Sequence, residues 1–288
     1  MKLVLRIWRQ ADRQAAGRLV RYELDDVSAD ATLLEALDGL NEQLVARGEP
    51  PVAFDSDCRE GICGACGVVV DGRPHGPLSR TPTCQVGLRA FRPGATVTIE
   101  PFATGVFPVL RDLVVDRGAL DRVVQAGGYV SVRAGAAPEA NAIAVDHDAA
   151  ERALDAAACI GCGACVAACP NGSASLFVGA KVAHLGRLPQ GQPERASRAR
   201  ALVAAADREG FGGCSLHGEC QAACPKGIGI DVIARLNRDY LAAEVAAWWR
   251  RERTLTGTRD ELPDGGGPPG LSAARASSRA GVPPRPPA

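Results

Sequence analysis

Two short cysteine-rich stretches constrain the fold of this chain more than any other feature. The first has the spacing C-x2-C-x2-C-x3-C-P, and its members are Cys159, Cys162, Cys165, Cys169 and Pro170. The second repeats the spacing with one change, and its members are Cys214, His217, Cys220, Cys224 and Pro225. Thiols at this spacing bind cubane iron–sulfur clusters, with three cysteines on one cluster and the cysteine before proline on another.

A zinc site is the alternative interpretation of these cysteines. Zinc takes four ligands around one tetrahedral ion, usually as two separated pairs. Four cysteines within a single short run, such as the run from Cys159 to Cys169, fit an iron–sulfur cluster better.

The two runs complete each other's ligand sets. If the cysteine before each proline crosses to the other run, one cluster receives four thiolates and the other receives three. The set predicted to bind [4Fe–4S] is Cys159, Cys162, Cys165 and Cys224. The three-thiolate set is Cys169, Cys214 and Cys220. A cluster corner without a thiolate tends to lose its iron, so we expect [3Fe–4S] at the second set.

His217 stands where the second run lacks a cysteine. Imidazole can ligate iron, so one interpretation places a fourth iron on His217. A second interpretation places His217 beside an open corner, where a group that titrates near neutrality suits proton chemistry. In a third, His217 is a satisfied polar residue with neither role.

A third cysteine set lies in the first third of the chain, at the spacing C-x4-C-x2-C with one distant cysteine. Plant-type [2Fe–2S] proteins have this spacing, and intervening glycines at 61, 64 and 67 let the backbone wrap closely around a cluster. The alternative, four buried structural cysteines, is rare in glycine-rich loops. The members are Cys58, Cys63, Cys66 and Cys84, and the three sets together use all eleven cysteines.

The pattern around the cysteines predicts an α+β chain, with an N-terminal β-grasp domain and a C-terminal all-α domain. Residues 2–9 and 19–24 alternate as two strands of a hairpin. Residues 32–47 show helical spacing, with a capping box formed by Thr32 and Glu35. Further strands are expected at 68–70 and 96–100, and further helices at 116–125, 148–158, 192–209 and 230–247.

The predicted domains follow from these elements. Residues 1–105 form the [2Fe–2S] ferredoxin-like β-grasp domain, and residues 148–250 form the helical ferredoxin-like domain with two cubane-type clusters. Residues 106–147 are a linker that either docks on a partner or packs within the chain. Residues 251–288 are rich in Pro and Gly and are expected to be a disordered tail.

Composition excludes several classes of function. The chain has 33 basic and 33 acidic residues, so no basic surplus indicates nucleic-acid binding. The N-terminus alternates like a strand rather than a signal peptide, and no run of 18 apolar residues predicts a membrane span. Metal ligation in a reducing compartment is therefore expected, rather than disulfides.

No nucleotide fingerprint or acid–base constellation is present, so we assign no catalytic residue and expect the substrate chemistry in another subunit.

A [2Fe–2S] domain followed by two cross-ligating runs resembles the iron–sulfur subunit of succinate dehydrogenase/fumarate reductase. The resemblance covers about residues 1–245, and its local phrases are Asp57–Gly64, Asp112–Asp116 and Cys224–Ile228. The stretches Cys159–Cys165 and Phe211–Cys214 resemble the branch found in actinobacteria and other menaquinone users.

The resemblance implies a flavoprotein partner whose FAD oxidises succinate to fumarate. Electrons would pass through [2Fe–2S], [4Fe–4S] and [3Fe–4S] to a quinone, menaquinone in this branch, held between this subunit and a membrane anchor. It also implies a place on the cytoplasmic side of the cell membrane, with Pro170 and His217 near the quinone. The alternatives are the equivalent subunit of a quinol:fumarate reductase and a free ferredoxin-like electron carrier.

The sequence departs from the family in two places. Tryptophans follow the first Cys-Pro in the well-known ubiquinone-using members, whereas Asn171–Ser175 stands there in this chain. The family's quinone-site residues therefore do not carry over to these positions. In addition, 17 residues separate Cys66 from Cys84, which is long for the family.

Overall fold

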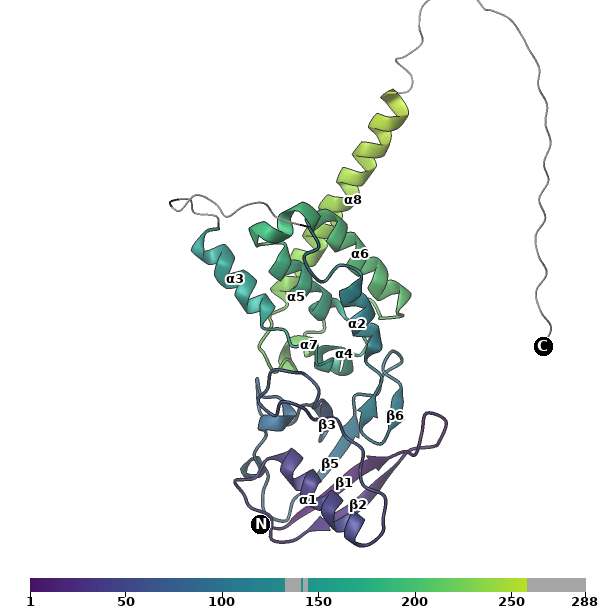
Figure 1. Cartoon of the computed structure of the whole chain (residues 1–288), viewed down its shortest axis with the longest axis vertical. Helices are drawn as coiled ribbons and strands as arrows, with labels where there is room; N and C mark the ends of the chain where they lie inside the picture. Colours follow the sequence, from purple (N-terminus) through teal and green to yellow (C-terminus); the bar gives the residue numbers. More distant parts are fainter. Residues whose placement is uncertain (133–140, 142–144, 258–288) are drawn as a thin grey trace, which may run out of the picture. The chain divides into compact units, whose positions relative to one another are not determined.

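The computed structural model describes residues 1–132, 141 and 145–257, with side chains up to Trp249 (Figure 1). The strands are β1 (Leu3–Arg9), β2 (Arg18–Leu24), β3 (Val68–Val70), β4 (Arg73–Pro74), β5 (Thr96–Pro101), β6 (Val109–Arg111) and β7 (Val114–Val115). The α-helices are α1 (Leu33–Ala46), α2 (Gly118–Gln125), α3 (His147–Ala157), α4 (Ala164–Ala168), α5 (Ser175–Leu185), α6 (Arg195–Arg208), α7 (Glu219–Ala222) and α8 (Asp231–Gly257). Short 3-10 helices lie at Thr83–Gln85, Leu88–Ala90 and Pro189–Glu194.

The N-terminal part is built on a five-stranded mixed sheet in the order β2-β1-β5-β3-β4. β1 pairs antiparallel with β2 and parallel with β5, and Leu5 faces Tyr22 on one side and Val97 on the other. A central first strand paired parallel with the last strand of the sheet, with a helix between them in sequence, is the β-grasp arrangement. The predicted fold of this part is confirmed.

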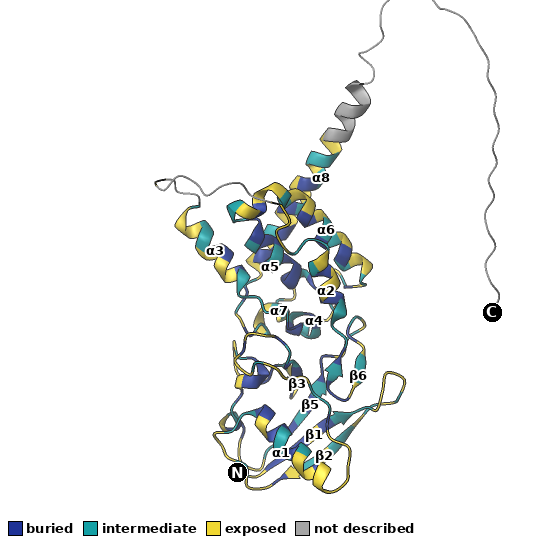
Figure 2. Cartoon of the chain, viewed as in Figure 1, coloured by how far each residue is buried: buried dark blue, intermediate teal, exposed yellow. Residues whose placement is uncertain are grey.

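Helix α1 packs its apolar stripe onto one face of the sheet. The side chain of Thr32 accepts a hydrogen bond from the Glu35 backbone N–H, and the Glu35 carboxylate accepts one from the Thr32 N–H, so the predicted capping box is present. Dark blue marks buried residues on this helix and on the facing strands in Figure 2. The buried residues of this core include Leu33, Leu37, Leu40, Leu44, Leu5, Ile7, Val97 and Ile99.

The C-terminal part is helical, as predicted, and its most buried element is α5. Most residues of α5 are buried, including Leu176, Phe177 and Val182. A helix that is apolar on all sides lacks the one-sided periodicity that marks a surface helix. The sequence pattern therefore gave no prediction for it.

The predicted helix over 192–209 begins later than expected. A 3-10 helix covers Pro189–Glu194, and regular α-helix begins at Arg195. Pro193 has no N–H to donate and its ring clashes with a preceding turn. It therefore disfavours regular α-helical hydrogen bonding before Arg195.

The described part of the predicted linker packs within the chain. Residues 109–115 form the two-stranded β6–β7 sheet, and α2 buries Leu120 and Val123 against the helical core. The Arg122 guanidinium also makes a bidentate contact with the Glu209 carboxylate, at 2.7–2.9 Å. Residues 133–140 and 142–144 of the predicted linker lie outside the described residues.

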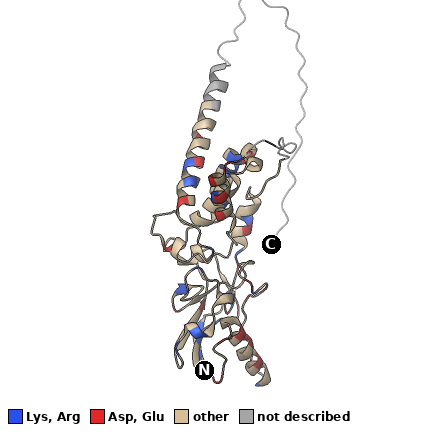
Figure 3. Cartoon of the chain, turned by 90° about the vertical axis from the view of Figure 1, so that its left-hand side faces the viewer, with Lys and Arg blue, Asp and Glu red and all other residues tan. Residues whose placement is uncertain are grey.

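Helix α8 continues to Gly257, past the domain boundary predicted at residue 250, and the predicted tail from 258 onward lies outside the described residues. Its first half carries both basic and acidic residues (Figure 3). The buried carboxylate of Asp239 accepts hydrogen bonds from Arg195 and Arg235 at 2.6–3.1 Å, which ties α8 to α6. No helix within the described ranges is long and apolar enough to cross a membrane.

Candidate iron–sulfur centres

Three cysteines of the [2Fe–2S] set, Cys58, Cys63 and Cys66, lie in a loop without regular secondary structure between α1 and β3, which we call the first cysteine loop; the fourth, Cys84, lies in the 3-10 helix Thr83–Gln85. Gly61 and Gly64 both have a φ of +73°, which a glycine adopts without strain. The Glu60 N–H donates to Cys58 Sγ at 3.3 Å and the Ala65 N–H donates to Cys63 Sγ at 3.4 Å. The loop thus turns its amides toward its own sulfurs, as a negatively charged cluster requires.

The thiols of this set interact in sequence, Cys58 with Cys63, Cys63 with Cys66, and Cys66 with Cys84. Hydrogen bonds from the backbone N–H groups of Glu60 and Ile62, and then contact with Cys63, lower the pKa of Cys58 to about 7. Burial, and then the neighbouring Cys84 thiol, raise the pKa of Cys66 to about 12. The structure therefore brings together Cys58, Cys63, Cys66 and Cys84.

The two later runs fold alike, which explains their common spacing. Each forms a short helix after a left-handed glycine, Gly163 with φ +88° before α4 and Gly218 with φ +85° before α7. Each Cys-Pro pair is then followed by a second left-handed glycine, Gly172 in the first run and Gly227 in the second. Helices α4 and α7 pack against one another, so the two cysteine runs lie side by side.

The four-cysteine set lines a single cavity, where both runs contribute. The Ile228 N–H donates to Cys224 Sγ at 3.4 Å, so the crossing cysteine also receives a backbone amide. The apolar walls of the cavity include Leu176 and Phe177 of α5. The cysteines that line it are Cys159, Cys162, Cys165 and Cys224.

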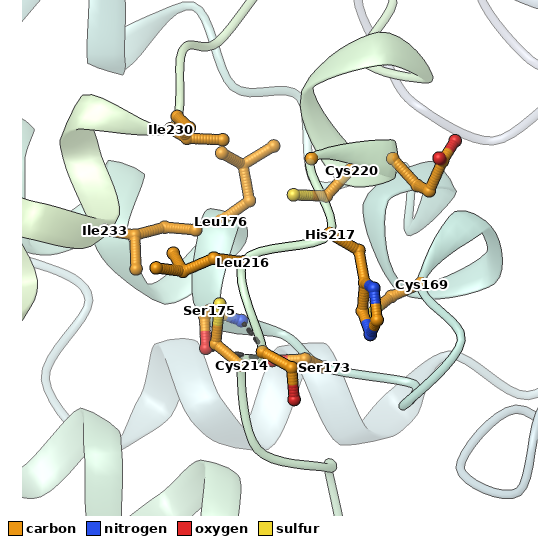
Figure 4. Close-up of a pocket in the computed structure, with 13 residues that line it drawn as sticks. Cys169, Ser173, Ser175, Leu176, Cys214, Leu216, His217, Cys220, Ile230 and Ile233 are labelled. Atoms are coloured by element: carbon orange, nitrogen blue, oxygen red, sulfur yellow. Dashed lines mark hydrogen bonds between the residues drawn. The ribbon is translucent and has the colours of Figure 1, made fainter.

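The three-cysteine set lines a second cavity, drawn in Figure 4. Leu176, Leu216, Ile230 and Ile233 gather on one side of it in this view. Leu176 lines both cavities and so lies between them. Its cysteines are Cys169, Cys214 and Cys220, and His217 lies beside Cys169 and Cys220 in its lining.

Each cavity is lined by cysteines of both runs, and the space between its walls is about 360 Å³ with open solvent included. In the part of the chain that the structure describes, no three His, Cys, Asp or Glu side chains converge on one metal ion. Cysteines line each of the two cavities, which is the arrangement that a multi-atom cluster needs.

The buried thiols need a positive partner before they can ionise. Burial raises the pKa of Cys162 to about 12 and raises the pKa of Cys165 well above its ordinary value, because both are removed from water. Cys165 lies deep in the protein, and its accessible surface faces the cavity. A metal core supplies the charge that stabilises thiolates in such a site. The donor set therefore fits iron–sulfur clusters.

Three residues that the sequence did not single out join these centres. Asn171 Nδ2 donates to the Gly213 carbonyl at 3.0 Å and to Ser215 Oγ at 2.8 Å, so it ties the two runs together beside Cys214. Arg117 and His75 lie between the sheet part and the helical part. Arg117 donates to backbone carbonyls 53 and 45 residues away, and His75 bonds to Thr83, eight residues on. No sequence signal predicts such contacts.

The residues predicted to lie near a quinone are at the second cavity or next to it. His217 is exposed and lines the cavity, while Pro170 is exposed and directly follows its ligand Cys169. Leu216 beside His217 keeps 70% of its surface exposed. This side of the cavity is thus reachable from outside the chain.

The long gap between Cys66 and Cys84 packs against the helical part. Its loop at 76–81 lines a cleft together with Ala167 and Ala168 of the first run and with Glu219, Ala222 and Ala223 of the second. The Arg80 side chain lies against Gly227, where a Cβ atom would be 2.9 Å from Arg80 Nε. The extra length therefore covers both cysteine runs.

Two family models match the chain where the structure places the cysteine sets. A 2Fe-2S iron-sulfur cluster binding domain matches residues 4–122, and a 4Fe-4S dicluster domain matches residues 155–228.

Curated relatives match over most of the chain. The succinate dehydrogenase iron-sulfur subunit of Bacillus subtilis is 31% identical over 200 residues, which is 66% of this chain and 72% of the relative. The fumarate reductase iron-sulfur subunit of Mycobacterium tuberculosis is 30% identical over 246 residues, which is 81% of this chain and 89% of the relative. The chain belongs to the family of succinate dehydrogenase/fumarate reductase iron–sulfur subunits. These relatives are subunits of an oxidoreductase complex, and the predicted resemblance is confirmed.

A solved structure agrees with the fold. A chain of the Mycobacterium smegmatis Sdh1 complex in the apo form matches with a TM-score of 0.55 at 19% identity, over 82% of this chain and 94% of that chain. The arrangement of a small-sheet [2Fe–2S] domain and a helical ferredoxin-like domain is thus shared with that structure.

Gly64→Ala should separate the first cysteine loop from the second. A Cβ atom at Gly64 would lie 2.5 Å from the Ile160 carbonyl oxygen and 3.1 Å from the Cys162 N. Gly72→Ala is the matched control, because Gly72 has a similar φ of +76° but no atom within 4 Å of its Cβ position. Both variants should lose about 1 kcal/mol to the left-handed backbone. Gly64→Ala should also reduce the iron content per chain, and it should lower the thermal unfolding midpoint more than Gly72→Ala does. Equal losses in the two variants would contradict the contact between Gly64 and the Ile160–Cys162 backbone.

His75 should make stability depend on pH. Burial, and then the charge of Arg117, lower the pKa of His75 from 6.5 to about 4. Between these values the unfolded chain binds a proton that the folded chain excludes, so stability should fall as pH falls, by about 1.4 kcal/mol per pH unit. Urea unfolding from pH 7 to 5.5 measures this slope. His75→Gln should flatten it, whereas substitution of the exposed His147 by Gln should leave it unchanged; an unchanged slope in His75→Gln would disprove the assignment.

Proposed function

We propose that this chain is the electron-transfer subunit of a succinate:quinone oxidoreductase. It would relay electrons from the FAD of a flavoprotein subunit, through three clusters, to a membrane quinone. The observation that carries this proposal is the lining of the two cavities. Four cysteines line one cavity and three line the other, and each cavity takes cysteines from both runs. The clusters, when bound, accept and release single electrons.

The ligand assignment is part of the proposal. Cys58, Cys63, Cys66 and Cys84 would hold [2Fe–2S]. Cys159, Cys162, Cys165 and Cys224 would hold [4Fe–4S]. Cys169, Cys214 and Cys220 would hold [3Fe–4S], because His217 takes the place of the fourth cysteine.

The order of the relay follows from which loops touch. The first loop meets the second where Gly64 lies against Ile160 and Cys162, and the two cavities meet at Leu176. The [4Fe–4S] site therefore lies between the other two. This supports passage from the sheet domain, through the middle site, to the three-cysteine site.

The partners and the location are proposed on the same basis. The exposed residues Pro170, Leu216 and His217 give the three-cysteine site an open side, which suits a quinone held against a membrane anchor subunit. Menaquinone on the cytoplasmic side of the cell membrane agrees with the sequence resemblance. We also keep the domain division of residues 1–105, 106–147 and 148–250, with α8 extended to Gly257.

Quinol:fumarate reductase is the second candidate, because the Mycobacterium tuberculosis relative, which is covered over 89% of its length, is named a fumarate reductase subunit. The same relay serves both directions. Purification of the chain with its neighbours, followed by assays of succinate oxidation and fumarate reduction, distinguishes the two. A chain that purifies alone and passes electrons to no quinone would support a free carrier instead.

Iron analysis tests the cluster assignment. The anaerobically purified protein should hold about nine irons per chain, the sum of two, four and three. Oxidised samples should show the EPR signal of a [3Fe–4S] cluster. Zinc in place of iron, or no such signal, would refute the assignment.

His217→Cys tests the role of the missing cysteine. A fourth thiolate at this position should retain a fourth iron, so the variant should hold about ten irons per chain and lose the [3Fe–4S] EPR signal. His217→Ser offers no thiolate and serves as the control, with the wild-type signal expected. A four-iron cluster already present in the wild type would show that the open-corner assignment is wrong.

A further inference from the structure

Arg117 joins the backbone of the first cysteine loop to that of the second. It directly precedes α2, and its Nη1 donates to the Gly64 carbonyl at 2.6 Å and to the Cys162 carbonyl at 3.0 Å. Gly64 lies between Cys63 and Cys66 of the [2Fe–2S] set, and Cys162 belongs to the [4Fe–4S] set. One nitrogen atom thus contacts the main chain of both proposed centres.

The two loops touch through main-chain atoms at this point. Gly64 has no side chain, and a Cβ atom there would lie 2.5 Å from the Ile160 carbonyl oxygen. On the far side, Gly163 lies against the Phe107 ring and the Arg117 side chain, with 3.0 Å and 3.6 Å from its Cβ position. Phe107 is fully buried, and Gly163 leaves the space that the Arg117 side chain and the Phe107 ring occupy around it.

The charge of Arg117 is directed at these loops. Its neighbour Asp116 is engaged elsewhere, because its carboxylate accepts from the Gly118 N–H at 2.9 Å and from Arg13 at 2.7 Å. Among the side chains that the structure describes, Arg117 makes no ion pair; its hydrogen bonds go to Gly64 and Cys162. A positive charge at a partly buried site favours the more negative, reduced form of a nearby redox group.

We propose that Arg117 is a positioning residue for electron transfer between the first two centres. It holds the Gly64 loop against Ile160 and Cys162, and its charge raises the reduction potentials of both clusters. One electron leaves the reduced [2Fe–2S] cluster and enters the oxidised [4Fe–4S] cluster; no covalent bond forms or breaks. This inference rests on the proposed ligand sets.

Arg117→Met and Arg117→Lys separate the charge from the contact. The experiment uses the anaerobically purified full chain, with redox titration of each cluster by EPR and rapid-freeze EPR after reduction of the [2Fe–2S] cluster. Arg117→Met should lower the equilibrium for reducing the [4Fe–4S] cluster about tenfold, which is about 59 mV for one electron. It should also slow transfer between the two clusters and weaken their spin–spin coupling. Arg117→Lys keeps the charge, so its potentials should stay near wild type while transfer slows.

Arg122→Gln is the matched control. It removes one positive charge from α2, but Arg122 pairs with Glu209 and not with the cysteine loops. Its potentials and transfer rate should match the wild type. A [4Fe–4S] potential that shifts as much in Arg122→Gln as in Arg117→Met would overturn the inference.

The outcomes separate this inference from the proposed function. If the wild type lacks a [2Fe–2S] or [4Fe–4S] signal, the ligand sets are wrong. If the wild type has both signals and Arg117→Met keeps its potentials and transfer rate, the inference alone fails. Should Arg117→Met not accumulate with full iron, Arg117→Lys decides, because a wild-type transfer rate in that variant would refute the positioning role.

Discussion

Buried thiols that are neutral by themselves are the physical constraint on which this structure depends. Burial raises the pKa of Cys162 and of Cys165, so thiolates form there only with a positive core beside them. The protein must therefore build a wall around a volume, not a pocket around one ion. Left-handed glycines such as Gly163 and Gly218 and small residues such as Ala164 provide that wall. Aromatic residues make up only 4% of the chain, since metal–thiolate bonds share the work of the core.

The sequence predicted the parts of the fold whose cause is local. Strand alternation in β1 and β2 and the capping box at Thr32 depend on neighbouring residues, and they appear as expected. The cysteine sets were also predictable, because the spacing of the two runs and the cysteine count allow few assignments. Helix α5 was not predictable, since a helix buried on all sides has no polar face to mark its period. Arg117 was not predictable either, because its partners are carbonyls 53 and 45 residues away.

The segment between Cys66 and Cys84 has a packing role in the chain. Its loop reaches the helical part, where Arg80 lies against Gly227 and residues 76–81 face both cysteine runs. His75, at the start of this loop, is buried against Phe102, with its Nδ1 bonded to Thr83 beside Cys84. These residues thus connect the [2Fe–2S] cysteine set to the elements that carry the other two sets.

The two junctions of the proposed relay are built from different chemistry. At the junction of the first two sites, the Gly64 backbone lies against the Ile160 backbone, and the Arg117 guanidinium donates to the Gly64 and Cys162 carbonyls. Its positive charge would stabilise an electron on either of the two clusters. At the second, Leu176 separates the cavities and supplies no charge. The last site must therefore draw electrons by its own composition, which would differ from that of the middle site by one iron and one thiolate. The charge of Arg117 at the first junction would thus favour entry of electrons into the first two sites, and passage onward would depend on the composition of the three-cysteine site.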